Sequence, residues 1–306
     1  MLAFLSVIAM VIVFIFVIKN ALPVIKGSGS AFWTKATFDE QITNAYNAPY
    51  DEPIYQFGML GLIIGTLFST LLALVMAIPV GIGAASVMNE YAPVWLKAPS
   101  VAIVRLLASI PSIVFGLLGL MVVVPWVEKT FITVDMQIEF LDRFQMTGRN
   151  LLTTSIVLAI MIVPMIVSLS IDAMLSVSNS LREVGTAMGM NRWRVTWKIV
   201  LPSAKSGIIA GIILATGRGI GEAIAISMVS GGIGLIPNPA NGAGFLLSPV
   251  LTLASAIINK SEAISVPSIE SALFACGAIL LSIGAVLSIL SRLLEKVIRK
   301  KEGLDA

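Results

Sequence analysis

Two charged residues stand inside a long apolar stretch near the middle of the chain's second half. Arg218 and Glu222 lie in the run Gly217-Arg-Gly-Ile-Gly-Glu222, and their spacing of four would place both on one face of a continuous helix. Charges at membrane depth are costly and usually face a bundle interior or a water-filled path. One interpretation is a pathway in which Arg218 attracts an anion and Glu222 tunes or pairs with it. The other, equally weighted, is an ion pair that fixes helix packing.

A second polar interruption is Ser109-Ile-Pro-Ser112, which also lies within apolar sequence. Pro111 has no amide hydrogen and interrupts the helical hydrogen-bond ladder, while Ser109 and Ser112 bring hydroxyl groups to the same depth. Broken helices of this kind often line a substrate route, although a proline kink can equally serve shape alone. We therefore take Ser109, Pro111 and Ser112 as candidate pathway residues together with Arg218 and Glu222.

The run from Glu183 to Pro202 is polar and basic and separates two hydrophobic stretches. Ser180 and Glu183 have the spacing of a capping box, which predicts the start of a short helix. Gly189 suits the left-handed turn that ends such a helix, and Asn191 is a good cap for a second one that should end before Pro202. The predicted helix-turn-helix could dock in a partner's groove. The alternative is a solvated hairpin that only satisfies the positive-inside rule.

The composition sets the class of protein that must position these residues. Of 306 residues, 57% are hydrophobic and 12% are charged, whereas soluble domains are about 45–50% apolar. An all-α integral membrane protein follows. The chain has no histidine, which excludes imidazole metal and acid-base sites, and its single Cys276 permits no intrachain disulfide. We expect no metal site and no catalytic residue.

Apolar runs predict six membrane spans, because a crossing needs about 20 apolar residues. The second run is too long for one crossing, and Pro79 with Gly81 and Gly83 is expected to kink it or to end its membrane portion. The predicted spans are Leu2–Ile18, Phe57–Met88, Val101–Val127, Leu151–Leu175, Ser206–Ser230 and Ile269–Leu290.

Lysine and arginine counts predict the orientation of these spans. The segment Ser176–Lys205 and the tail after Leu290 each carry five basic residues, so both should be cytoplasmic. Six spans then place both termini in the cytoplasm and the acid-rich loops outside. The expected division is a first helix and external loop over residues 1–56, a transmembrane core over 57–295 with coupling helices at 178–202, and a basic cytoplasmic tail over 296–306.

Two segments leave alternatives open. Phe245–Ile258 is apolar for about fourteen residues and contains Pro249, so it favours an interfacial or re-entrant helix over a seventh span. At the amino terminus no basic leader precedes the first apolar run, and the small residues at Gly27–Ala31 would also fit a cleaved signal peptide.

Several motifs together resemble one family. The order Glu183, Gly189, Ile199 and Leu201-Pro202 matches the cytoplasmic coupling loop of ABC importer permeases. The chain resembles the permease subunits of phosphate-specific ABC importers, more closely the PstC type than the PstA type. The stretches that carry this resemblance are SIPSIVFGLLGL from Ser109, GRGIGEA from Gly217 and PVGIGAASVMNEYAP from Pro79.

The resemblance implies a type I ABC importer permease (MetI-like) fold, with a cytoplasmic coupling helix between spans four and five, in the plasma membrane of a prokaryote. It also implies a second, PstA-type permease subunit, two ATPase subunits and an external phosphate-binding protein. No cofactor is expected in this chain: it contains no Walker A pattern, and ATP and magnesium would sit on the ATPase. The residues assigned to ATPase coupling are Glu183, Gly189, Arg192, Trp193, Ile199, Leu201 and Pro202.

The chain also departs from the family pattern. Many relatives have alanine where this chain has Gly185, and glycine should loosen that helix by about 1 kcal/mol. Where many relatives have threonine after the Gly-Glu pair, this chain has Ala223. The expected function is phosphate import by alternating access. The alternatives are a permease for another oxyanion such as sulfate or molybdate, an ATP-independent channel or secondary transporter, and a membrane scaffold that only signals phosphate status.

Overall fold

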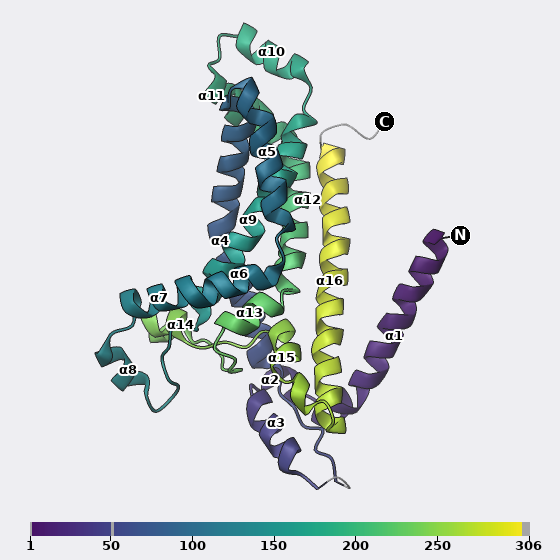
Figure 1. Cartoon of the computed structure of the whole chain (residues 1–306). Coiled ribbons are helices and arrows are strands. Elements are labelled where there is room, and N and C mark those ends of the chain that lie inside the picture. Colours follow the sequence, from purple (N-terminus) through teal and green to yellow (C-terminus); the bar gives the residue numbers. More distant parts are fainter. Residues whose placement is uncertain (1, 50–51, 302–306) are drawn as a thin grey trace. The chain divides into compact units, whose positions relative to one another are not determined.

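The computed structural model describes residues 2–49 and 52–301, and helices dominate this part of the chain (Figure 1). Six of its helices are long and apolar enough to cross a membrane, which confirms the predicted class. The fourth has the predicted bounds. The six are Leu5–Ser28, Leu60–Tyr91, Ser112–Phe131, Leu151–Leu175, Arg192–Ile220 and Pro267–Leu294.

Contacts divide the chain into two compact units, which are described one at a time. The first unit contains the segment ending at Leu71 together with Ser112–Val157 and Ile220–Gly284. Its helices begin with α1 (Leu2–Ser28), α2 (Ala31–Thr34), α3 (Phe38–Asn47), the start of α4 (Leu60–Ser86), α6 (Ser112–Leu118), the π-helical turn η2 (Gly119–Val123), α7 (Val124–Phe131) and α8 (Val134–Phe140). They continue with the start of α9 (Leu151–Leu175), α13 (Ile224–Val229), η4 (Pro239–Asn241), α14 (Ala243–Leu247), α15 (Leu253–Asn259), η5 (Ser261–Ala263) and most of α16 (Pro267–Lys301).

The first unit is held by an apolar core and by a polar tie. Phe32, Phe38 and Phe57 are fully buried in a cluster that also includes residues of α1, α15 and α16. Asp39 in α3 accepts a hydrogen bond from the Gly234 amide and forms an ion pair with Lys260 at 2.7 Å. The carboxylate therefore joins α3 to the segment that follows α13.

Within this unit α6 and α13 pack side by side at very close range (Figure 1). A Cβ atom on Gly116 would lie 2.9 Å from the Cα of Ala225 and 2.8 Å from the sulfur of Met228. Such an approach requires glycine, because any larger residue would push the helices apart.

The second unit contains Leu72–Pro111, Leu158–Gly219 and the segment beginning at Ala285. Its core is formed by buried aliphatic side chains, including Val104, Val167 and Ile171. It combines the later parts of α4 and α9 with the π-helical turn η1 (Val87–Tyr91), α5 (Val94–Ser109), α10 (Asn179–Ala187), α11 (Arg192–Val195), the π-helical turn η3 (Thr196–Val200) and α12 (Leu201–Ile220).

Three predicted spans were wrong in their bounds. The first was expected to end at Ile18, but α1 runs on to Ser28. The third was expected to run from Val101 to Val127 through a kink, but α5 ends at Ser109 and a separate helix begins at Ser112. Pro111 donates no amide hydrogen bond, so the ladder stops there. The fifth was expected at Ser206–Ser230, but α12 ends at Ile220 and α13 begins only at Ile224.

Two further predictions concern prolines inside long helices. The helix expected to end before Pro202 instead continues into α12, because the wider π turn η3 precedes the proline, with the Leu201 amide bonded to the Thr196 carbonyl five residues earlier. The helix α4 continues through Pro79 to Ser86, and the expectation that this proline kinks the helix or ends its membrane portion stays a prediction. The apolar run Phe245–Ile258 forms the short helices α14 and α15, so it is not a seventh span.

Candidate functional site

The coupling segment, residues 178–202, follows α9 after a turn that the sequence did not predict. The expected capping box of Ser180 and Glu183 does not form, because α10 begins at Asn179 and Ser178 is its N-cap. Ser180 is therefore already inside the first turn, where its hydroxyl lies 3.0 Å from that of Ser178. A residue with helical backbone geometry cannot act as an N-cap.

The turn and the second cap are confirmed. Gly189 has φ +76°, and the Met190 amide returns to the Gly185 carbonyl at 3.1 Å. This left-handed turn is the one that glycine adopts at least cost. The side chain of Asn191 accepts a hydrogen bond from the Arg194 amide at 2.9 Å and so caps α11.

Gly185 is where the two short helices of the coupling segment meet. It is buried, and a Cβ atom there would lie 2.5 Å from Cδ1 of Ile199 and 3.1 Å from Cγ2 of Val195. The expectation that glycine only loosens this helix was incomplete. The missing methyl group also lets α10 approach α11 and η3, so the departure from alanine has a packing role.

Arg182 anchors the coupling segment to the rest of the second unit. Its guanidinium donates to the carbonyls of Met174 at 2.8 Å and Val177 at 2.6 Å, at the end of α9, and forms an ion pair with Glu90 at 3.2 Å. Glu90 also accepts from the Asn89 amide group at 2.8 Å. The sequence analysis did not single out this pair, and its only signal was the polar Asn-Glu-Tyr that follows a long apolar run.

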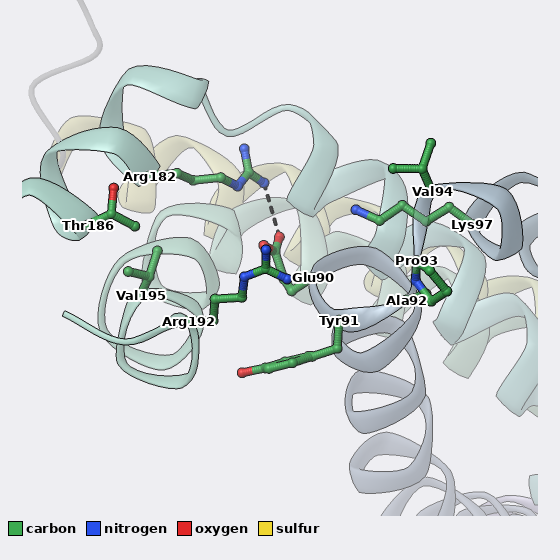
Figure 2. Close-up of a pocket in the computed structure, with 10 residues that line it drawn as sticks. All are labelled: Glu90, Tyr91, Ala92, Pro93, Val94, Lys97, Arg182, Thr186, Arg192 and Val195. Carbon is green, nitrogen blue, oxygen red and sulfur yellow. Dashed lines mark hydrogen bonds and ion pairs between the residues drawn. The ribbon is translucent and has the colours of Figure 1, made fainter.

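A pocket of about 630 Å³ opens beside this pair (Figure 2). Figure 2 shows Arg182, Arg192 and Lys97 arranged around Glu90, with Tyr91 below them. Three cations face one carboxylate, so the lining has a net charge of +2 and favours an anionic group. The lining residues are Glu90, Tyr91, Ala92, Pro93, Val94, Lys97, Arg182, Thr186, Arg192 and Val195.

The predicted coupling residues differ in their accessibility. Glu183, Gly189, Arg192, Trp193 and Pro202 are exposed and available to a partner. The other two, Ile199 and Leu201, are half-buried: Leu201 packs against the core of the unit, and Ile199 lies against Gly185. The first group presents a surface, and the second supports it from behind.

The candidate pathway residues of the second unit lie at the ends of α5 and α12. Arg218, in the last turn of α12, is half-buried and donates to the Ala108 carbonyl at 3.3 Å. This carbonyl is among the last four of α5, which have no intrahelical donor. Ser109 donates to the Leu106 carbonyl at 2.7 Å, and Pro111 follows in the break. The guanidinium therefore binds a neutral acceptor, which leaves its charge uncompensated by that contact.

The candidate pathway residues of the first unit are Ser112 and Glu222. Ser112 opens α6, and Glu222 precedes α13 and is 91% buried, with 9% of its surface exposed. One Glu222 oxygen accepts from the Ala225 amide at 3.0 Å, at the first turn of α13. The prediction that Arg218 and Glu222 share a helix face was wrong, because α12 ends at Ile220 in a glycine-rich stretch of weak helix formers.

The comparisons with known proteins agree on one family. A family model described as "Binding-protein-dependent transport system inner membrane component" matches residues 77–300. The chain is 37% identical over 255 residues to the "Phosphate transport system permease protein PstC" of Pasteurella multocida (strain Pm70), an alignment that covers 81% of this chain and 77% of that protein.

Solved structures show the same fold. The chain is similar to a bacterial alginate ABC transporter chain with a TM-score of 0.56 and 16% identity, over 98% of this chain and 95% of the other. It is similar to a chain of the inward-facing MetNI methionine ABC transporter with a TM-score of 0.54 and 16% identity, over 76% and 93%. The predicted MetI-like fold is confirmed. The chain belongs to the family of inner-membrane components of binding-protein-dependent transport systems and, within it, to the PstC-type permeases.

Proposed function

We propose that this chain is the permease subunit of an ATP-driven importer that translocates inorganic phosphate into the cytoplasm. The observation that carries the proposal is the 37% identity to a phosphate permease over most of both chains. The coupling segment supports it, because Gly189 and Asn191 build a compact, exposed helix-turn-helix of the kind that docks in a groove.

The proposed complex has three other subunits and an external delivery protein. A PstA-type permease pairs with this chain, two ATPase subunits hold ATP and magnesium, and a phosphate-binding protein delivers the anion. Both termini and the coupling segment are cytoplasmic, as the clustering of lysine and arginine favours. This chain contributes no catalytic residue. ATPase closure moves the coupling helices, and the permease alternates between outward and inward access.

Arg218 is the residue assigned to the anion. A cation in a low-dielectric pathway lowers the electrostatic cost of moving a phosphate through it. Arg218 keeps that capacity because its hydrogen bond goes to the neutral Ala108 carbonyl. Glu222 instead holds the start of α13, where a carboxylate also interacts favourably with the unbonded amides. Ser109, Pro111 and Ser112 are proposed to shape the route at the break between α5 and α6.

The test is reconstitution of the complex with its co-purified partners in vesicles. Phosphate with its binding protein should stimulate ATP hydrolysis and uptake, and Arg218→Gln should abolish uptake while the complex still assembles. Arg105→Gln is the matched control, because Arg105 pairs with Asp172 on the exposed surface of the same unit, and such pairs contribute only about 0–1 kcal/mol. Unchanged uptake by Arg218→Gln would remove this residue from the pathway.

The same vesicles separate the alternatives. Preferential uptake of sulfate or molybdate would assign another oxyanion. Transport that persists after removal of residues 179–195 would indicate a channel or secondary transporter, whereas the proposed function requires loss of ATPase association. The absence of any flux would leave only a signalling scaffold.

A further inference from the structure

The cationic pocket lies at the end of a helix that is longer than a bilayer is thick. The continuous helix Leu60–Tyr91 has 32 residues, which is about 48 Å at 1.5 Å per residue, while the hydrocarbon core is about 30 Å thick. The end that carries Asn89 and Glu90 is the polar one, and Glu90 is paired there with Arg182. This end and the pocket beside it therefore project beyond the hydrocarbon core.

Large apolar side chains are exposed at the same end of the second unit. Val94 and Trp95, at the start of α5, are 88% and 74% exposed, and Trp193 on α11 is 59% exposed. The rings of Tyr91 and Trp193 contact each other with centroids 6.4 Å apart, so the start of α5 and the coupling segment are adjacent. Exposed apolar groups outside the lipid mark a surface for a protein partner, and tryptophan and arginine are the residues that most often dominate such surfaces.

The charge of the pocket lining favours an acidic group as its occupant. Its lining has a net charge of +2, because three cations accompany the single carboxylate of Glu90. Its volume of about 630 Å³ is much larger than one inorganic phosphate. Arg182, Arg192 and the other α10 and α11 residues of its lining belong to the coupling segment, so the pocket is continuous with the surface assigned to the ATPase.

We propose that this pocket, together with Val94 and Trp95, is a second docking surface for the ATPase subunit, and that it receives a segment presenting a carboxylate next to an apolar side chain. The inference rests on the proposed function. It adds the start of α5 to the coupling segment as a point of contact. The helix α5 is continuous from Val94 to Ser109. The ATPase would therefore contact the first turn of the helix whose last turn binds Arg218 through the Ala108 carbonyl.

The first test is charge reversal followed by pull-down of the ATPase from the co-expressed complex. Lys97→Glu should lower ATPase recovery by about tenfold or more, since a like charge facing a carboxylate is strongly unfavourable. Lys129→Glu is the matched control, because Lys129 is exposed on α7, does not line the pocket and lies where the predicted topology places the chain outside the membrane; it should change recovery less than about twofold. Equal recovery for both variants would overturn the proposal.

A second test leaves Lys97 intact, because its ammonium group also hydrogen-bonds the Asn89 carbonyl. The single native Cys276 is buried, so a Val94→Cys variant gives a maleimide signal from one exposed site. That site should react in the permease alone and be protected in the assembled complex, while Asp135→Cys on exposed α8 stays reactive in both. Unprotected Val94→Cys in the complex, or protection by anionic-lipid nanodiscs without the ATPase, would overturn the proposal.

Failure of this proposal is distinguishable from failure of the proposed function. If removal of residues 179–195 abolishes ATPase recovery but Lys97→Glu does not lower it and Val94→Cys stays reactive, the second docking surface is wrong and the importer function stands. If removal of residues 179–195 also leaves recovery unchanged, both are wrong.

Discussion

Replacing Arg182 with methionine should detach the coupling segment from the rest of the second unit. The guanidinium donates four hydrogen bonds. The acceptors are the carbonyls of Met174 and Val177, the side-chain oxygen of Asn179 and the carboxylate of Glu90. Methionine keeps much of the side chain's apolar volume but donates no hydrogen bond. Arg182→Met therefore removes the polar anchor without opening a large cavity.

The expected cost follows from the burial of the pair. The side chains of Arg182 and Glu90 are 21% and 13% exposed, and removing one partner of a buried ion pair costs about 3–5 kcal/mol. Both side chains keep partial access to water, so we expect Arg182→Met to cost about 3 kcal/mol, the lower end of that range. This cost corresponds to a change on the order of 100-fold in the folded-to-unfolded ratio. Glu90→Gln should cost only about 1 kcal/mol, because the arginine keeps its two carbonyl partners.

The assay is reversible denaturant unfolding of the detergent-solubilised chain, followed by tryptophan fluorescence. A double-mutant cycle of Arg182→Met with Glu90→Gln should show a coupling free energy of about 1–2 kcal/mol. Arg194→Met, which changes an exposed arginine on α11, should leave the midpoint nearly unchanged. The reasoning is refuted if Arg182→Met is no more destabilising than Arg194→Met.

Three further outcomes are expected. A Cβ atom on Gly61 would collide with the backbone carbonyl of Gly234, whereas one on Gly83 meets open space. In thermal unfolding, Gly61→Ala should lower the free energy of unfolding by about 2 kcal/mol. Gly83→Ala should raise it by up to about 1 kcal/mol. Asn191→Ala removes the cap of α11 and should cost about 1 kcal/mol and weaken ATPase recovery, while Asn191→Asp restores both; equal effects of the two would contradict the cap. Glu222→Gln keeps an acceptor for the α13 amide, whereas Glu222→Ala removes it. The alanine variant should therefore be about 1 kcal/mol less stable than the glutamine variant, and their unfolding midpoints check this.

The sequence predicted the elements whose signals are local. Gly189 and Asn191 were identified from residue type alone, because a left-handed turn and an N-cap each depend on one residue and its immediate neighbours. The fourth span was bounded correctly because its apolar run is uninterrupted. The predicted capping box was wrong because two serines near the start of α10 fit the N-cap position. Ser178 is the N-cap, whereas the pattern assigned that position to Ser180.

The breaks in the third and fifth spans were signalled but misjudged. Pro111 and the glycines before Glu222 were noted as features inside continuous spans, yet the chain ends a helix at each place. Local pattern could not decide between a kink and a break. That choice depends on partners far away in the sequence, such as Ala108 for Arg218 and Ala225 against Gly116.

By itself the sequence determined that the chain is a membrane protein with six apolar spans, since hydropathy and charge act residue by residue. It also predicted which segment meets a partner, and that assignment stays a prediction. Only the tertiary structure decided what surrounds that segment. Arg182 reaches Glu90 across 92 residues, and Lys97 joins the same pocket. Long side chains at distant positions carry no shared periodicity, so their meeting becomes visible only when packing brings their helices together.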